Sequence, residues 1–250
     1  MWKLALLCNI TLIFLLIVYS PIVNSDEIEV GFEPFPPLIN EDGSGMVVEM
    51  LSALSANHNI DFNVQIMTYG RAKKNLKNRL VKLIGMTPFQ LETHDFYEYA
   101  TELNWHINTH VYLFSLDKEY FNIEKLPPGS IGTLIGNAEF LSEVVKVPLT
   151  KFVEVSHLTQ LVKMLALGRL NVILFEGVAA MNTIKSLKIK DVYFKEMGLV
   201  PSSLAVSNTA QGLMLKEKLD TFLSDVENQN FFHKFVHYTP SKDSGIIIIE

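Results

Sequence analysis

Cysteine is almost absent from this sequence of 250 residues. Cys8 is the single one, and it lies in an apolar segment at the start of the chain. Once that segment is removed, the rest of the chain has no thiol for a disulfide bond, for nucleophilic attack or for metal ligation. Cysteine chemistry is therefore excluded.

Basic residues are outnumbered. The chain has 21 Lys and Arg against 27 Asp and Glu, a formal charge of −6, and residues 1–25 hold one Lys and no acid, so the rest carries 20 minus 27, or −7. A chain without a broad basic surface is not expected to bind nucleic acid. The P-loop, G-x-G-x-x-G and G-x-S-x-G patterns are absent too, so no motif supports a nucleotide cofactor or a serine nucleophile.

One long apolar run is present, and it lies at the N-terminus. Lys3 precedes an almost unbroken apolar stretch over residues 4–23, which ends at Val23-Asn24-Ser25, just before the first acid, Asp26. This order is typical of a secretory signal, so we expect residues 1–25 to be cleaved on export. An uncleaved membrane anchor is the alternative, because about 20 apolar residues can span a bilayer.

The remaining chain alternates short apolar strands with amphipathic helices, which indicates an α/β protein with helices covering a sheet. A break at Pro127-Pro128-Gly129 separates two units of similar pattern. We expect strands near residues 28–32, 62–67, 81–86, 111–114, 130–134, 172–175 and 204–206, and helices near 47–56, 71–79, 136–145, 159–167 and 211–235.

Several local motifs accompany this order of elements. They are Ile28 to Leu38 with its Phe35-Pro36-Pro37 turn, Gly45 followed by Glu49, Tyr69-Gly70-Arg71-Ala72, Ile131-Gly132 with Gly136-Asn137, and Leu167-Gly168-Arg169-Leu170-Asn171. Together they make the chain resemble a divergent member of family 3 of the bacterial solute-binding proteins, which includes the amino-acid ABC transporter substrate-binding proteins.

The resemblance implies the type II periplasmic binding protein fold, with two α/β sheets in two lobes joined by two crossing hinge strands. Lobe one would comprise residues 26–112 plus 203–250, and lobe two residues 115–200, with hinges near 111–115 and 200–204. It also implies a periplasmic monomer that performs no chemistry and needs no metal or cofactor. Its partners would be a small polar solute and an inner-membrane ABC permease or a sensor protein.

One departure from the family bears on the solute. Amino-acid binders of the family clamp the ligand carboxylate with an arginine, a residue suited to bidentate pairing, but Thr93, or Glu92, stands at that position here. Glu176 lies where relatives place the acid that holds a ligand ammonium. Two acids, Glu33 and Glu176, without the arginine favour a cationic or neutral solute, unless Arg71 supplies an anion contact.

Eight residues are candidates for the binding site because they follow strands, where loops of open α/β sheets face a cleft. They are Glu33, Phe35, Tyr69, Arg71, Thr87, Thr93, Asn137 and Glu176. Each has a structural alternative: a solvated loop acid for Glu33, packing of the turn for Phe35, an exposed basic face for Arg71, and a helix N-cap for Asn137.

Two other functions stay open at this point. The lost arginine fits a sensory or interaction module of the same fold that transports nothing. A small-acid dehydratase is the enzyme alternative, with Glu33 and Glu176 as acid and base. The pairs His106/His110 and His233/His237 have a spacing that could bind zinc on a helix, but neither has a third ligand, so surface histidines are expected.

Overall fold

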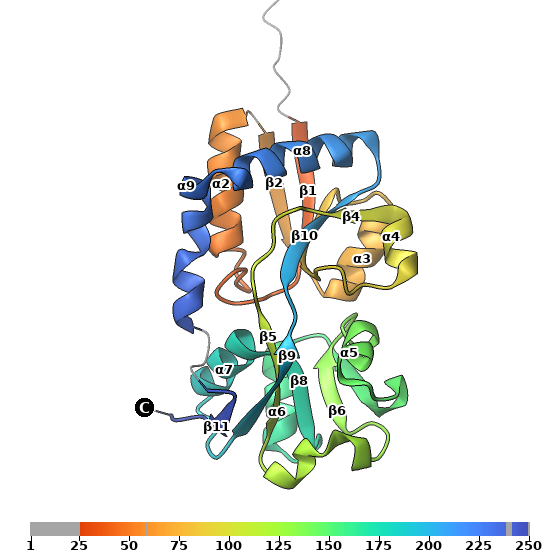
Figure 1. Cartoon of the computed structure of the whole chain (residues 1–250), viewed down its shortest axis with the longest axis vertical. Helices are drawn as coiled ribbons and strands as arrows, with labels where there is room; N and C mark the ends of the chain where they lie inside the picture. The colour runs from red at the N-terminus through yellow and green to blue at the C-terminus, as the bar shows by residue number, and fades with distance from the viewer. Residues whose placement is uncertain (1–25, 59, 239–241, 250) are drawn as a thin grey trace, which may run out of the picture.

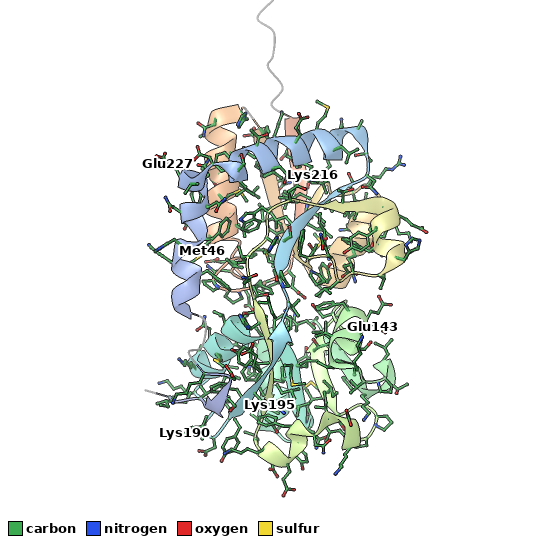
Figure 2. All side chains as sticks on the ribbon, in the orientation of Figure 1. Met46, Glu143, Lys190, Lys195, Lys216 and Glu227 are labelled. Atoms are coloured by element: carbon green, nitrogen blue, oxygen red, sulfur yellow. The ribbon has the colours of Figure 1, made fainter. Side chains whose placement is uncertain are left out.

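The structure is a computed structural model that describes residues 26–58, 60–238 and 242–249. The expected signal, residues 1–25, lies outside the described residues. Figure 1 shows two lobes stacked along the long axis, connected at a narrow waist. In Figure 2, Met46, Lys216 and Glu227 mark the upper lobe, and Glu143, Lys190 and Lys195 mark the lower one.

The first lobe contains a five-stranded sheet in the order β2-β1-β3-β10-β4. Its strands are β1 (Asp26–Phe32), β2 (Ile60–Ile66), β3 (Leu83–Pro88), β4 (Ala100–Glu102) and β10 (Ser202–Ser207). β1 lies parallel to β2 and β3, with Val30 opposite Val64 and Leu83, while β10 runs antiparallel to β3 and β4. The parallel strands all end toward the waist, so the loops after them face the other lobe (Figure 1).

The second lobe contains a six-stranded sheet in the order β11-β9-β5-β8-β6-β7. Its strands are β5 (His110–Ser115), β6 (Ile131–Leu134), β7 (Phe152–Val155), β8 (Val172–Glu176), β9 (Tyr193–Leu199) and β11 (Ser244–Ile246). All five residues of β8 are buried, as expected for a central strand covered on both faces.

Helices cover both sheets. In lobe one they are α2 (Met46–His58), α3 (Tyr69–Lys77), α4 (His94–Tyr99), α8 (Ala210–Ser224) and α9 (Val226–Gln229), and in lobe two α5 (Ala138–Val145), α6 (Leu158–Ala166) and α7 (Gly177–Ser186). Short 3₁₀ segments occupy Lys118–Phe121, Ile123–Lys125, Leu149–Lys151 and Asn230–Tyr238. The expected helix over 211–235 is interrupted because Asp225 ends α8 and accepts a hydrogen bond from the Glu227 N–H, which starts α9. No helix in the described segments is long and apolar enough to cross a membrane.

Two chain segments cross between the lobes side by side. One runs from β4 into β5, and the other joins β9 to β10 (Figure 1). Ile107 and Ser202 exchange backbone hydrogen bonds of 2.9 and 2.8 Å, and the Val200 N–H donates to the Thr109 carbonyl at 2.8 Å. The structure therefore confirms the two-lobed α/β fold with two crossing strands.

Two segments lie in a different sheet from the one expected from the sequence. β5 pairs within the second sheet from His110 onward, although the resemblance implies that lobe one extends to residue 112. β11 also pairs with β9 of the second sheet, whereas the resemblance implies that all of residues 203–250 belong to lobe one. Burial explains the position of β11. Ile247, just after β11, is 6% exposed and donates its N–H to the Val192 carbonyl.

Candidate functional site

The candidate site lies between the lobes, where strands of both sheets end. A cavity of about 20 Å³ opens there, which is about the space that one water needs. Its wall is largely apolar, with Phe35, Met86, Val111, Phe140, Phe175 and Val200. The polar side chains on its wall are Thr109, Asn137, Glu176 and Ser202. Of the eight expected site residues, Phe35, Asn137 and Glu176 line this cavity.

Glu33 follows β1 and is 3% exposed. Its carboxylate accepts hydrogen bonds from the Asn137 Nδ2 at 3.3 Å and from the Tyr69 N–H at 3.4 Å. Burial raises the pKa of Glu33 to about 8, although these two donors and the charge of Lys73 act to lower it. Within the described residues no basic side chain forms an ion pair with it. A cation arriving here would relieve the cost of burying this carboxylate.

Two aromatic rings from opposite lobes form part of the wall. Phe35, in the turn after β1, is 7% exposed, and its ring centroid lies 6.1 Å from that of Phe175 on β8. This spacing is in the range of favourable aromatic contacts. Phe175 could not be predicted as a site residue, because in a sequence a buried strand residue looks the same whether it faces a core or a cleft.

Glu176 ends β8 and begins α7. It is 4% exposed, and its two carboxylate oxygens accept the N–H groups of Val178 at 2.9 Å and Ala179 at 2.7 Å. The side chain therefore caps the N-terminus of α7, as in other capped helices. Burial raises the pKa of Glu176 to about 7 against the two backbone donors. Both acids accept hydrogen bonds at both oxygens, but the donors lie at 3.3–3.4 Å from Glu33 and at 2.7–2.9 Å from Glu176, so the Glu33 carboxyl is the less well satisfied of the two.

Asn137 lies in the turn between β6 and α5. Its side chain makes no capping hydrogen bond to α5. Its amide instead donates to the Glu33 carboxylate and to the Leu134 carbonyl at 3.3 Å, while Glu154 accepts the N–H groups of Gly136 and Ala138 at that helix start. Asn137 thus connects lobe two to the buried acid of lobe one.

Tyr69 and Arg71 begin α3 but point to different surroundings. Tyr69 is fully buried, and its hydroxyl donates to Glu92 at 2.8 Å; burial and the Glu92 charge raise the pKa of Tyr69 well above its usual value. Arg71 is exposed, and the cavity wall does not include it. Lys73, one turn further along, lies against Glu92 at 3.2 Å. Lys73 could not be singled out from the sequence, because it is one of several lysines in a basic run.

Thr87 and Thr93 lie outside the cavity wall. Thr87, on β3, is fully buried, and its hydroxyl acts to lower the pKa of Glu102. Thr93 precedes α4 without capping it. Near them is Glu102, an acid that the sequence analysis missed: its Oε2 accepts the Gln90 N–H at 2.9 Å, and burial raises its pKa to about 6.

Among the described side chains, no group of three metal-ligating residues occurs. His106 stacks on Phe89 with ring centroids 4.5 Å apart, and His110 pairs with Glu196 at 2.6 Å. These contacts give His106 and His110 different surroundings. The side chain of His237 lies outside the described residues.

Neither a protein-family model nor a curated protein sequence matches the chain. Solved structures do. A mutant of ArgBP from T. maritima is similar with a TM-score of 0.68 at 18% identity, over 84% of this chain and 95% of that one. The amino-acid ABC transporter substrate-binding protein AbpA from Streptococcus pneumoniae, bound to L-arginine, is similar with a TM-score of 0.66 at 15% identity, over 84% and 93%. The chain has the fold of these two-lobed binding proteins.

A histidine kinase sensor domain with similarity to periplasmic binding proteins is also similar, with a TM-score of 0.61 at 14% identity, over 86% of this chain and 93% of that one. The VFT2 domain of Bordetella pertussis BvgS is similar with a TM-score of 0.63 at 11% identity, over 85% of this chain and 93% of that domain. The comparisons confirm the fold that the sequence motifs predicted. At these identities they establish the architecture, and the solute has to be argued from the cleft itself.

Proposed function

We propose that the chain is an exported two-lobed receptor that binds a small cationic or neutral solute between its lobes and performs no chemistry on it. The observation that supports this most is Glu33, a carboxylate buried at the junction of the lobes with no basic partner among the described residues. The fold supports it too, because most of the similar structures are binding proteins, four of them described as bound to arginine.

The charges around the cleft disfavour a solute that depends on a carboxylate. No lysine or arginine lines the cavity. Arg71 is exposed, and the amine of Lys73 is held by Glu92. An anion in the cavity would therefore find no basic side chain on the wall to pair with, and it would lie close to the Glu176 carboxyl.

The receptor would deliver its solute to an ABC-type permease or report it to a sensor protein. A sensory role without transport is the second candidate, and it is favoured by the direct contacts between the lobes. The Gly70 N–H donates to the Ile135 carbonyl across the cleft at 3.0 Å. A protein held closed by its own groups can present one fixed surface to a partner.

A thermal-shift screen of the full chain against amino acids, polyamines, small organic acids and sugars tests the proposal. We expect an amine or a neutral compound to raise the melting temperature, because a ligand that binds the folded state stabilises it by mass action. Glu33→Gln should abolish the rise. The matched control is Glu98→Gln, an exposed acid on α4, which should leave it unchanged.

Two results would contradict the proposal. One is that no compound shifts the melting temperature of a chain that still melts cooperatively. The other is that only anionic compounds shift it, and that they do so equally in Glu33→Gln.

A further inference from the structure

The lobes contact each other directly at one edge of the cleft. There the start of α3 lies against the turn of residues 135–137 before α5, and Figure 1 shows α3 directly above α5. The Gly70 N–H donates to the Ile135 carbonyl at 3.0 Å, and the Lys73 Nζ donates to the Gly136 carbonyl at 3.0 Å. We call these two hydrogen bonds the interlobe latch.

Two glycines bring the backbones of the lobes into contact at the latch. Gly136 has φ +98°, a conformation that favours glycine. A Cβ at Gly136 would lie 2.4 Å from the Gly70 nitrogen and 2.7 Å from its Cα. The lobes therefore approach more closely here than any other residue at position 136 would allow.

Lys73 is held in place for this contact by its own lobe. Its amine lies 3.2 and 3.4 Å from the two oxygens of Glu92 and 4.7 Å from the centre of the Tyr69 ring. The side chain of Lys73 is 13% exposed and that of Glu92 is 1% exposed. A lysine ammonium has three N–H donors. Two contact the Glu92 carboxylate, and the third donates across the cleft to the Gly136 carbonyl.

From this geometry we infer that Lys73 is a positioning residue that holds the two lobes closed on each other in the absence of solute. It touches the backbone of lobe two, and it does not line the cavity. Its effect on a solute is therefore indirect: the more firmly the latch holds, the smaller the fraction of molecules that are open for entry, and the weaker the apparent affinity.

The latch can be weakened in two independent ways, one at the backbone contact of Gly70 with Gly136 and one at the Lys73 hydrogen bond. Gly136→Ala places a methyl group into the Gly70 backbone. Its matched control is Gly168→Ala, where φ is +66° but a Cβ would meet nothing within 4 Å. The second variant combines Lys73→Met with Glu92→Gln, so that no buried carboxylate is left without its cation. Its control is Lys74→Met, at an exposed neighbour on the same helix.

The readout is the distance between the lobes, measured by electron paramagnetic resonance in buffer without any solute. Cys8 is the only cysteine of the chain, so the full chain with Cys8→Ser carries spin labels only at His94→Cys on α4 and Glu143→Cys on α5. Both positions are exposed, and Glu143 is marked in Figure 2. A role in folding stability alone would not move this distance.

We expect one narrow, short distance in the parent chain and in both controls. Each unlatched variant should gain a longer distance, with the open-to-closed ratio raised at least about tenfold, because hydrogen bonds to charged groups are among the stronger ones. If the double variant does not fold, the spin-label distance in Gly136→Ala alone tests the inference. An open parent chain, or unlatched variants with the parent distance, would overturn the inference. The thermal-shift screen tests solute binding, and the spin-label distance tests closure of the lobes. Failure of the proposed function and failure of this inference can therefore be told apart.

Discussion

At the scale of single residues, the two buried acids of the site, Glu33 and Glu176, differ in how well their carboxyl groups are hydrogen-bonded. Glu176 satisfies the N-terminus of α7 with both oxygens, whereas Glu33 has only donors at 3.3 and 3.4 Å. The cost of burial is offset better at Glu176 than at Glu33, which agrees with pKa values of about 7 and about 8. Short-range partners of this kind cannot be read from a sequence, since they depend on where each loop places its N–H groups.

The raised pKa of Glu33 predicts that stability falls as pH rises. Between its ordinary pKa of 4.5 and about 8, the folded chain keeps a proton on Glu33 that the unfolded chain has released. Each unit of pH in that window then lowers the free energy of unfolding by up to about 1.4 kcal/mol. Glu33→Gln should flatten the slope measured by urea denaturation from pH 5 to pH 8.

Glu176 titrates in the same direction, so part of the slope should remain in Glu33→Gln. Glu98→Gln, the exposed control, should keep the full slope. A Glu33→Gln chain whose stability falls with pH as steeply as the parent chain would show that the Glu33 carboxyl is not protonated when folded.

At the scale of elements, the strands and helices with strong apolar patterns could be predicted from the sequence. β1, β3, β8 and α6 all lie within two residues of the expected ranges. The short elements could not be predicted from the sequence, and β11 is the clearest case. A run of four isoleucines is compatible with a strand or a tail, and its partner β9 lies about 50 residues earlier in the chain.

The last strand offers a test with a matched pair. Ile247 is 6% exposed and Ile248 is 74% exposed. Ile247→Ala should lower the free energy of unfolding by about 2 kcal/mol, at the low end for a buried isoleucine because the site is at a sheet edge. Ile248→Ala should change it by less than about 0.5 kcal/mol. Equal effects of the two changes, measured by urea denaturation, would place this segment off the sheet.

At the scale of the whole molecule, the crossing segments and the latch act on the same motion from different places. The crossing segments join the lobes and are paired by backbone hydrogen bonds such as those between Ile107 and Ser202. The latch holds the two lobes together at the edge where α3 meets α5. The motifs of the sequence predicted the two lobes and their crossing. They did not predict the latch, because Lys73 and Gly136 are 63 positions apart and meet only once both lobes have formed.

The crossing segments predict a second effect on opening. Thr109 is 2% exposed, and its hydroxyl contacts the Ser202 hydroxyl at 2.8 Å and the Val200 carbonyl. Thr109→Val keeps the shape but leaves these groups short of a partner, which should cost about 1–2 kcal/mol. We also expect a broader distribution of the 94–143 spin-label distance.

The control for this change is Thr221→Val on the exposed side of α8. It should alter neither the free energy of unfolding nor the distance distribution. A Thr109→Val chain with a narrow, unchanged distribution would show that the crossing segments are stiff without this hydroxyl.

The first and last strands of the described chain lie in different lobes. β1 starts at Asp26 in lobe one, and β11 lies in lobe two (Figure 1). A module attached before Asp26 and another attached after β11 would therefore be carried by different lobes. A rotation of the lobes that moves β11 relative to Asp26 would then change the separation of the two attached modules.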